Sequence, residues 1–220
     1  GVTPMLTHKY IISTPKNMAI CSIIVVYIIL NEAMIPIKNK KKKLEFTVEE
    51  MRNFAINYTE KFAPSKQQLK TYLLKKYLKF KSKEVQRSNL YDIIDIVIED
   101  LEKSKFINDK FYSDSKAKNL VQRGSSINKI RNYLINKGIG EKYIKETINK
   151  INENNKDQDF FSAIKVCKKK RIGPSRNESN RPLFYKKDIG ILARSGFDFE
   201  TSKRVMELSK DEYLKIINLL

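Results

Sequence analysis

The sequence predicts an all-α fold, an elongated array of three tandem three-helix repeats. Apolar residues recur three or four positions apart through most of the chain, which is the spacing of amphipathic helices. In Ser126–Ile151 two such series flank a short break at Lys137–Gly140. Similar segments return about every sixty residues, and they align Leu73, Leu134 and Leu192. A repeat this small has too few apolar residues to form a core alone, so we expect the repeats to stack.

The first segment, residues 1–43, differs in composition from the rest of the chain. Its uninterrupted apolar run, Met18–Leu30, precedes a cluster of lysines that ends at Lys43. A membrane-spanning helix needs roughly 20 apolar residues, so the run is short for an anchor. Because the stretch that begins at Met34 resembles a natural start, we interpret residues 1–43 as a disordered leader or an over-extended start. A membrane anchor or export signal is the alternative.

Repeat 1 is predicted over residues 47–106. Thr47 and Glu50 have the spacing of a capping box, and so do Ser65 and Gln68. In this motif a side chain at each end of the first turn bonds the backbone N–H at the other end. Two helices should therefore begin at these serine and threonine positions, with a third after a lysine-rich connection.

Repeat 2 is predicted over residues 107–152 and repeat 3, with a C-terminal helix, over residues 158–220. Asn108 is a predicted N-cap, and Gly124 is a predicted helix stop. The polar run Asn152–Asp159 is interpreted as a linker between the two repeats, because it lacks the residue order of a calcium loop.

Reactive residue types are sparse. The chain has two cysteines, Cys21 and Cys167, and one histidine, His8, none of them in a metal-binding or catalytic spacing. No phosphate-binding glycine loop occurs, since the third glycine position of the segment at Gly138 is Tyr143. We therefore predict no catalytic residues, no metal site and no cofactor, and a protein that is not an enzyme.

The charge of the chain is strongly positive. There are 44 Lys and Arg against 25 Asp and Glu, a formal net charge of +19. Such a field attracts polyanions: nucleic acid, an acidic protein surface or an anionic membrane. Part of the lysine excess is also typical of proteins encoded by AT-rich genomes. The charge suggests a class of partner without identifying one.

Two blocks of the sequence have distinctive helix ends and loops. They are Ile98–Ile148, with its "RG" and "KGI" helix ends, and Lys168–Met206, with "RIGPSR" and "LARSGF". Both blocks resemble the RecX family, regulators of the RecA recombinase, and the second is similar to α-proteobacterial members. The sequence departs from the family in a longer connection at Lys81–Asn89 and in Tyr77, where a glycine is expected.

The resemblance implies a cytoplasmic protein that binds along the groove of the RecA–DNA filament. It would inhibit filament growth, strand exchange, ATPase and co-protease activities, and so modulate DNA repair and the SOS response. The implied partners are the RecA filament and the single-stranded DNA inside it. We expect a monomer and no membrane partner. A stand-alone nucleic-acid-binding protein with helix-turn-helix-like units is the alternative.

The candidate contact residues are basic and lie in repeats 2 and 3. Repeat 3 is the leading patch, and a solvated helix face is the competing interpretation for each residue. The aromatic residues Phe160, Phe161 and Tyr185 are interpreted as core rather than as stacking platforms for bases. The candidates are Arg123, Lys129, Arg131, Lys137, Lys168, Lys169, Lys170, Arg171, Arg176, Arg181, Lys186, Lys187 and Arg194.

Overall fold

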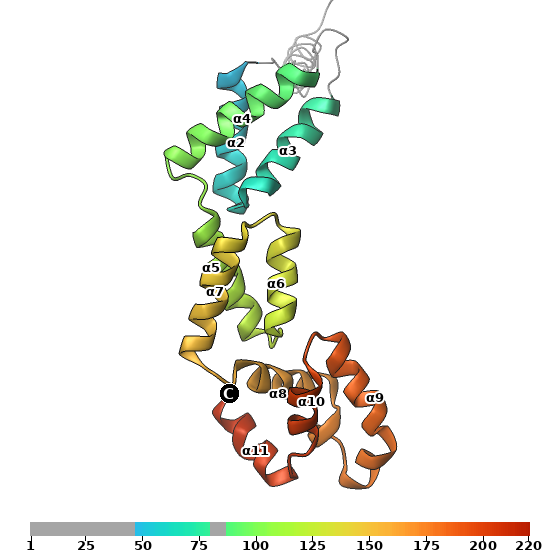
Figure 1. Ribbon diagram of the computed structural model, residues 1–220. Helices are drawn as coiled ribbons and strands as arrows, with labels where there is room; N and C mark the ends of the chain where they lie inside the picture. The colour runs from blue at the N-terminus through green and yellow to red at the C-terminus, as the bar shows by residue number, and fades with distance from the viewer. Residues whose placement is uncertain (1–46, 80–86) are drawn as a thin grey trace, which may run out of the picture. The chain divides into compact units, whose positions relative to one another are not determined.

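The structure, a computed structural model, describes residues 47–79 and 87–220, and this part of the chain is helical throughout (Figure 1). No strand occurs within these two ranges, so the all-α prediction is confirmed. Our predictions for residues 1–43 and for most of the connection at Lys81–Asn89 lie outside the described residues.

The helices follow one another with short connections. Two short 3-10 helices, η1 and η2, lie in the connection between α8 and α9. The elements are α2 (Val48–Phe62), α3 (Lys66–Lys79), α4 (Arg87–Lys103), α5 (Asp109–Gln122), α6 (Ile127–Asn136), α7 (Glu141–Asn154), α8 (Gln158–Lys170), η1 (Gly173–Ser175), η2 (Glu178–Asn180), α9 (Arg181–Arg194), α10 (Phe199–Met206) and α11 (Lys210–Leu219).

The helices α2, α3 and α4 pack around one apolar core, which includes Leu69, Leu73 and Ile94 (Figure 1). The predicted capping box is present at the start of α3. The Gln68 backbone N–H donates to Ser65 Oγ at 3.2 Å, and the Ser65 backbone N–H donates to Gln68 Oε1 at 3.1 Å. These bonds satisfy two backbone donors that the helix itself leaves without partners.

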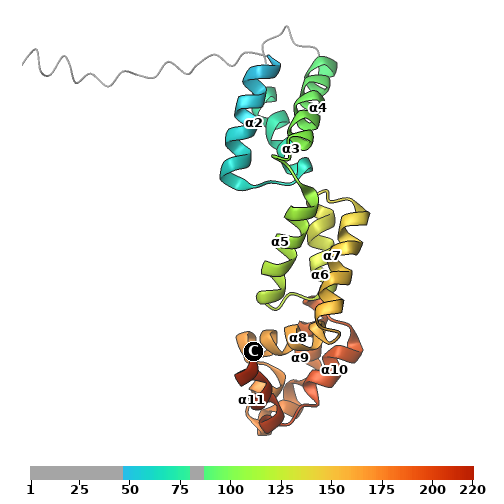
Figure 2. The same ribbon diagram turned by 90° about the vertical axis from the view of Figure 1, so that its left-hand side faces the viewer.

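A second core, which contains Leu134, lies among α5, α6 and α7 (Figure 2). The Asn108 side chain caps α5 as predicted, since its Oδ1 accepts from the backbone N–H of Phe111 at 2.9 Å. The connection from α6 to α7 turns at Gly138, which has a φ of +72°. That left-handed conformation favours glycine, and it ends α6 where the sequence predicted a break.

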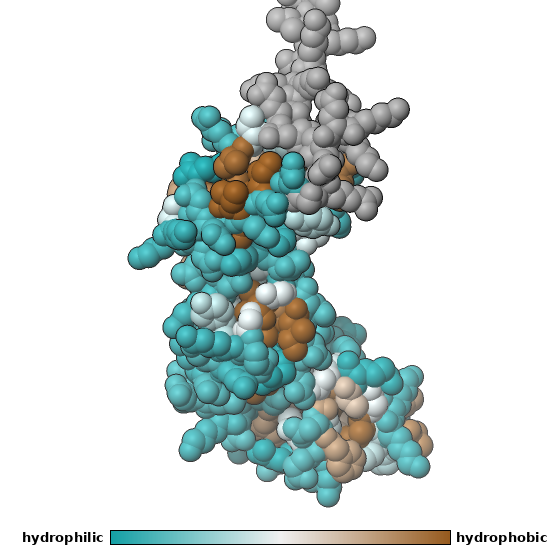
Figure 3. Space-filling model, turned by 45° about the horizontal axis from the view of Figure 1, so that its top comes forward, coloured by the Kyte–Doolittle hydropathy of each residue, from teal (hydrophilic) through white to brown (hydrophobic). Residues whose placement is uncertain are grey.

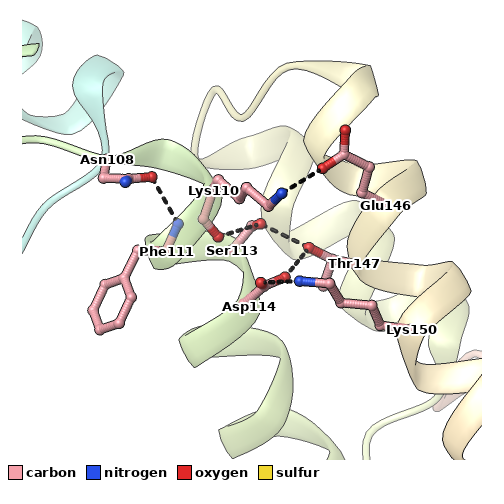
Figure 4. A network of polar contacts seen from close by, with 8 residues as sticks. All are labelled: Asn108, Lys110, Phe111, Ser113, Asp114, Glu146, Thr147 and Lys150. Carbon is pink, nitrogen blue, oxygen red and sulfur yellow. Dashed lines mark hydrogen bonds and ion pairs between the residues drawn. The ribbon is translucent and has the colours of Figure 1, made fainter.

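Polar side chains also join α5 to α7 (Figure 4). The hydroxyls of Ser113 and Thr147, both buried, share a 2.8 Å hydrogen bond. Thr147 donates to Asp114 Oδ1 at 2.8 Å, and Lys150 Nζ donates to Asp114 Oδ2 at 2.5 Å. Burial by itself would raise the pKa of Asp114, but these two hydrogen bonds hold it below its ordinary value.

A third core lies among α8, α9, α10 and α11 and includes Leu192, Phe197 and Val205. Phe160 and Tyr185 pack against this core, which confirms that both are core residues. Leu73, Leu134 and Leu192, aligned in the sequence, are each fully buried in one of the three cores. The elongated arrangement of three repeats with the stated boundaries stays a prediction.

The polar segment at Asn152–Asp159 is mostly helical, which differs from the predicted linker. Helix α7 continues to Asn154, and α8 begins at Gln158. Asp159 also has a tertiary contact: its carboxylate accepts a 2.8 Å hydrogen bond from the backbone N–H of Ile127, at the first position of α6. The sequence alone could not show that this acidic residue accepts a hydrogen bond from the first backbone N–H of a distant helix.

Two sets of hydrogen bonds connect neighbouring groups of helices, and they match each other. In the first, Ser65 Oγ donates to the carbonyl of Lys137 at 2.6 Å, and the Lys66 N–H donates to Asp109 at 2.8 Å. In the second, Ser126 Oγ donates to the carbonyl of Ser195 at 3.0 Å. The bond from Ile127 to Asp159 completes this second set.

In each set, a serine that caps the middle helix of one group bonds the C-terminal end of the middle helix in the next group. An aspartate from the next group accepts the first N–H of the capped helix. Burial raises the pKa of both acceptors, Asp109 and Asp159, above the ordinary value. The matched contacts favour the predicted repeat.

Candidate nucleic-acid interface

Basic residues from different helices meet where α6 begins. The chain at the end of α9 is held against this point by the bond from Ser126 to Ser195, and by Asn128 Nδ2, which donates to the Gly196 carbonyl at 3.3 Å. Gly196 has a φ of +92°, and a Cβ there would lie 2.5 Å from Ser126 Oγ. Glycine is therefore required for an approach that places Arg194 and Lys129 in adjoining turns.

The C-terminal end of α5 meets α8 at the same junction. Gly124 has a φ of +78°, and a Cβ on it would lie 2.9 Å from Lys165 Cβ and 3.1 Å from the Ser162 carbonyl. Further along α8, Lys170 Nζ donates to Ser195 Oγ at 3.4 Å. Three helix ends thus bring together basic residues that are far apart in the sequence.

We call this set the junction surface. Within the described ranges, none of its members forms an ion pair, so their charges remain available to a partner. Lys165 lies in the basic stretch of repeat 3 but was not one of the candidate contacts, and its proximity to Gly124, on another helix, adds it to the set. The junction surface consists of Arg123, Lys129, Lys165, Lys170 and Arg194.

The basic end of α8 continues from this surface. Lys168, Lys169, Lys170 and Arg171 are all exposed. Cations in the last turn of a helix interact favourably with its dipole, which is a structural reason for lysines at this position. Arg171 follows the helix with a φ of +53°, in the left-handed region that favours glycine. After α5, the residue in this left-handed conformation is a glycine, Gly124. After α8 it is Arg171, and a side chain in this conformation costs backbone strain.

Two of the candidate arginines near α9 have structural partners. Arg176 Nε and Nη2 donate to the two carboxylate oxygens of Asp188 at 2.7 and 2.9 Å, and Asp188 is fully buried. The Gly173 N–H donates to the same carboxylate at 2.8 Å. Burial would raise the pKa of Asp188, but these donors hold it below its ordinary value. The pair fastens the "RIGPSR" loop to α9.

Arg181 is the second of these arginines. Its Nη2 donates to the backbone carbonyls of Met206 and Leu208 at 2.6 and 2.7 Å. These bonds satisfy carbonyls at the C-terminal end of α10, where the helix provides no donors. Both arginines remain candidates for contact with a partner, but a change at either would also disturb the fold.

The remaining candidates lie outside the junction surface. Arg131 Nη1 pairs with Glu141 at 2.8 Å, and Lys137 Nζ lies 5.4 Å from the centre of the Tyr133 ring. Lys186 is exposed beside a surface hollow, and Lys187 Nζ lies 5.7 Å from the centre of the Phe184 ring. The contacts described above therefore group Arg123, Lys129, Lys170 and Arg194, and do not include these four.

The described residues offer little for metal or nucleophilic chemistry. In the ranges 47–79 and 87–220, no group of three or more His, Cys, Asp or Glu side chains is placed to hold a metal ion. Cys167 is buried, and burial, with a smaller effect of Asp188, raises the pKa of its thiol to about 12. At neutral pH this thiol is protonated and is a poor nucleophile.

None of the described helices has both the length and the apolar character needed to cross a membrane. Hydrophilic residues cover most of the face shown in Figure 3, with separate hydrophobic patches between them. The fold and the junction surface together define the class: an all-α protein that presents unpaired basic side chains at the meeting points of its helices.

This chain is similar to three curated proteins, each named "Regulatory protein RecX". The relative from Myxococcus xanthus (strain DK1622) is 28% identical over 161 residues, which are 71% of this chain and 84% of that protein. The relative from Clostridioides difficile (strain 630) is 31% identical over 129 residues, 56% of this chain and 57% of that protein. The relative from Clostridium perfringens (strain SM101 / Type A) is 25% identical over 147 residues, 66% of each chain.

These similarities support the RecX family of regulatory proteins, which the two sequence blocks resemble. No family model matches it, and no solved structure matches it. The α-proteobacterial type suggested by the sequence stays a prediction.

Proposed function

We propose that this protein binds the RecA–DNA filament and inhibits the recombinase. The activities that it inhibits are filament growth, strand exchange, ATP hydrolysis and co-protease activity. In this role it modulates DNA repair and the SOS response, in the cytoplasm and without enzymatic activity of its own. The junction surface is the observation that carries the proposal. It supplies unpaired cations at a meeting point of helices, in a chain whose relatives are named as regulators.

The physical basis is the sum of many weak contacts. A phosphate contact by Lys or Arg releases condensed counterions, so affinity for single-stranded DNA falls as salt rises, with a slope of about 0.7 per phosphate neutralised. Contacts to several filament subunits and to the enclosed strand would act together, because each bound contact raises the effective concentration of the next. A protein bound in this way blocks addition or movement of many subunits.

The first experiment is a titration of RecA ATPase activity on single-stranded DNA with this protein. We expect hydrolysis and strand exchange to fall at substoichiometric amounts, since one bound molecule affects many subunits. Unchanged filament activity, together with tight binding to bare DNA at physiological salt, would contradict the proposal. It would support the alternative of a stand-alone nucleic-acid-binding protein.

The second experiment locates the binding residues. Replacement of Lys168, Lys169, Lys170 and Arg171 by alanine should weaken inhibition and lower the salt slope of binding, by about 0.7 for each phosphate of single-stranded DNA that is no longer neutralised. A matched control replaces four exposed lysines that form no ion pair with a described residue, Lys75, Lys142, Lys145 and Lys215. Net charge changes by the same amount in both variants. If inhibition weakens equally in both, the overall field of the protein matters and the end of α8 does not bind the partner directly.

A further inference from the structure

A pocket with aromatic and basic walls lies where the end of α2 approaches the start of α5. Its volume is about 360 Å³, and it is lined in part by Pro64, Lys105, Phe106, Phe111 and Lys116. None of these residues belongs to the junction surface or to the candidate contacts predicted from the sequence.

Backbone geometry explains why two phenylalanine rings are exposed here. After α4 the chain turns at Lys105, whose φ of +59° is left-handed, and the Phe106 side chain is left 45% exposed. Asn108 then caps α5 by accepting from the Phe111 N–H, which fixes Phe111 in the first turn of that helix. The Phe111 side chain is 70% exposed, and Figure 4 shows its ring pointing away from α7 and from the polar network.

The charge around the pocket has one sign. Lys105 and Lys116 form no ion pair with any described residue, and Lys116 Nζ lies 5.4 Å from the centre of the Tyr112 ring. No described aspartate or glutamate lines the pocket. An occupant should therefore combine a flat apolar surface with negative charge. Nucleotides of a single strand have both, because every base has a stacking face and every linkage has a phosphate.

We propose that this pocket binds single-stranded nucleic acid, with one base stacked against Phe111 and flanking phosphates near Lys105 and Lys116. An apolar peptide could cover the rings, but it would leave both lysines without a partner. The site needs no recombinase, so it goes beyond the proposed function, and it can fail or hold independently of RecA inhibition.

The chain contains no tryptophan, which permits a direct test. In the full-length protein, Phe111→Trp places a single tryptophan, whose emission is distinct from that of the tyrosines, at the pocket. Tyr91→Trp is the matched control, since Tyr91 on α4 is 44% exposed and lies next to Asp92 rather than in a basic pocket. Each variant is titrated with oligo(dT), without RecA, while anisotropy of a labelled oligo(dT) reports total binding. We expect stacking to quench the tryptophan of the Phe111→Trp variant along the binding curve and to leave that of the Tyr91→Trp variant unchanged.

Two substitutions separate stacking from simple apolar contact. Phe111→Ala should weaken oligo(dT) binding by roughly 5-fold to 150-fold, the range for removal of one base stack. Phe111→Leu keeps apolar volume but lacks the ring, so it should weaken binding almost as much. Replacement of Lys105 and Lys116 by alanine should lower the salt slope by about two phosphate contacts. Urea unfolding of each variant checks that the fold is kept.

Four results would overturn the assignment. The first is an unquenched Phe111→Trp variant at oligo(dT) concentrations where anisotropy shows binding. The second is equal quenching of the Tyr91→Trp control. The third is undiminished binding by Phe111→Leu. The fourth is a change in emission of the Phe111→Trp variant with RecA alone and none with oligo(dT), which would identify the pocket as a protein-docking surface.

Discussion

Ser126 is bonded to Ser195 across the boundary between two groups of helices: its hydroxyl donates to the Ser195 carbonyl at 3.0 Å. The same oxygen accepts a hydrogen bond from the backbone N–H of Lys129 at 3.2 Å and so caps α6. Ser65 has the same double role toward Lys137 and Gln68. One small side chain thus starts a helix and joins it to its neighbour.

Replacement of either serine by alanine should therefore destabilise the protein. Ser126→Ala removes the cap of α6 and leaves the Ser195 carbonyl without its donor, so we expect a loss of about 1–3 kcal/mol in the free energy of unfolding. Ser65→Ala should cost a similar amount. Urea denaturation provides the measurement, with the exposed Ser115→Ala as the control. A neutral result for both buried serines would mean that the matched bonds contribute nothing to stability.

Leu134 should be much more sensitive to truncation than its neighbour. Leu134 is fully buried and Ile135 is 50% exposed. Leu134→Ala leaves a cavity in the second core and should cost about 2–5 kcal/mol. Ile135→Ala and Lys129→Ala should change stability little. A neutral Leu134→Ala with a strongly destabilising Lys129→Ala would contradict the helical register.

The pairing of Arg176 with Asp188 should stabilise the fold in a pH-dependent way. Arg176→Ala leaves a buried carboxylate without its cation, and we expect a loss of about 3–5 kcal/mol near neutral pH. The folded-state pKa of Asp188 is lowered, so the contribution of the pair is present above the ordinary aspartate pKa and is lost as the pH falls through the lowered value.

Urea unfolding near pH 7 and near pH 3 tests this difference, since an unperturbed aspartate titrates at about 3.9. The gap in stability between the wild-type protein and Arg176→Ala should shrink at the lower pH. In DNA-binding assays, an unchanged salt slope in this variant would show that Arg176 stabilises the fold and does not contact phosphate. A reduced slope with unchanged stability would assign it to phosphate contact instead.

Arg171 should stabilise a complex with a partner and at the same time lower the free energy of unfolding of the free protein. Its left-handed conformation costs an L-residue other than glycine about 1–2 kcal/mol, so Arg171→Gly should raise the free energy of unfolding by about 1 kcal/mol. Salt-dependent binding to single-stranded DNA should weaken at the same time.

Lys170→Gly is the matched control for Arg171→Gly, because it removes the same charge from the end of α8. Glycine inside a helix lowers stability by up to about 1 kcal/mol, so the two variants should differ in the sign of their effect on unfolding. If Arg171→Gly also destabilises the protein, contacts of the arginine outweigh the backbone strain.

Several local features followed directly from neighbouring residues. The capping box of Ser65 and Gln68, the N-cap Asn108 and the stop at Gly124 involve positions within a few residues of one another, where chain connectivity already brings the groups together. The burial of Leu134 followed from apolar spacing, which is a property of the helix itself.

For the candidate site, too, the sequence predicts features of a single helix but not contacts between distant segments. The basic character of α8 is evident from its composition, but the partners of Arg176 and Arg181 are not, because their bonds connect segments separated by a loop or a helix. The position of Lys165 beside Gly124 was missed for this reason, and so were the exposed ring of Phe111 and its pocket with Lys105.

The sequence by itself determined the helices, their caps and the excess of positive charge, because these depend on residue type and on spacing along one helix. Tertiary structure alone decided which charges remain free. Asp188 neutralises Arg176, whereas Arg194 and Lys129 lie in adjoining turns without an ion pair to any described residue. The physical reason is that an ion pair requires two groups within about 4 Å. Between helices that distance depends on packing, here on whether Gly196 permits the backbones to approach.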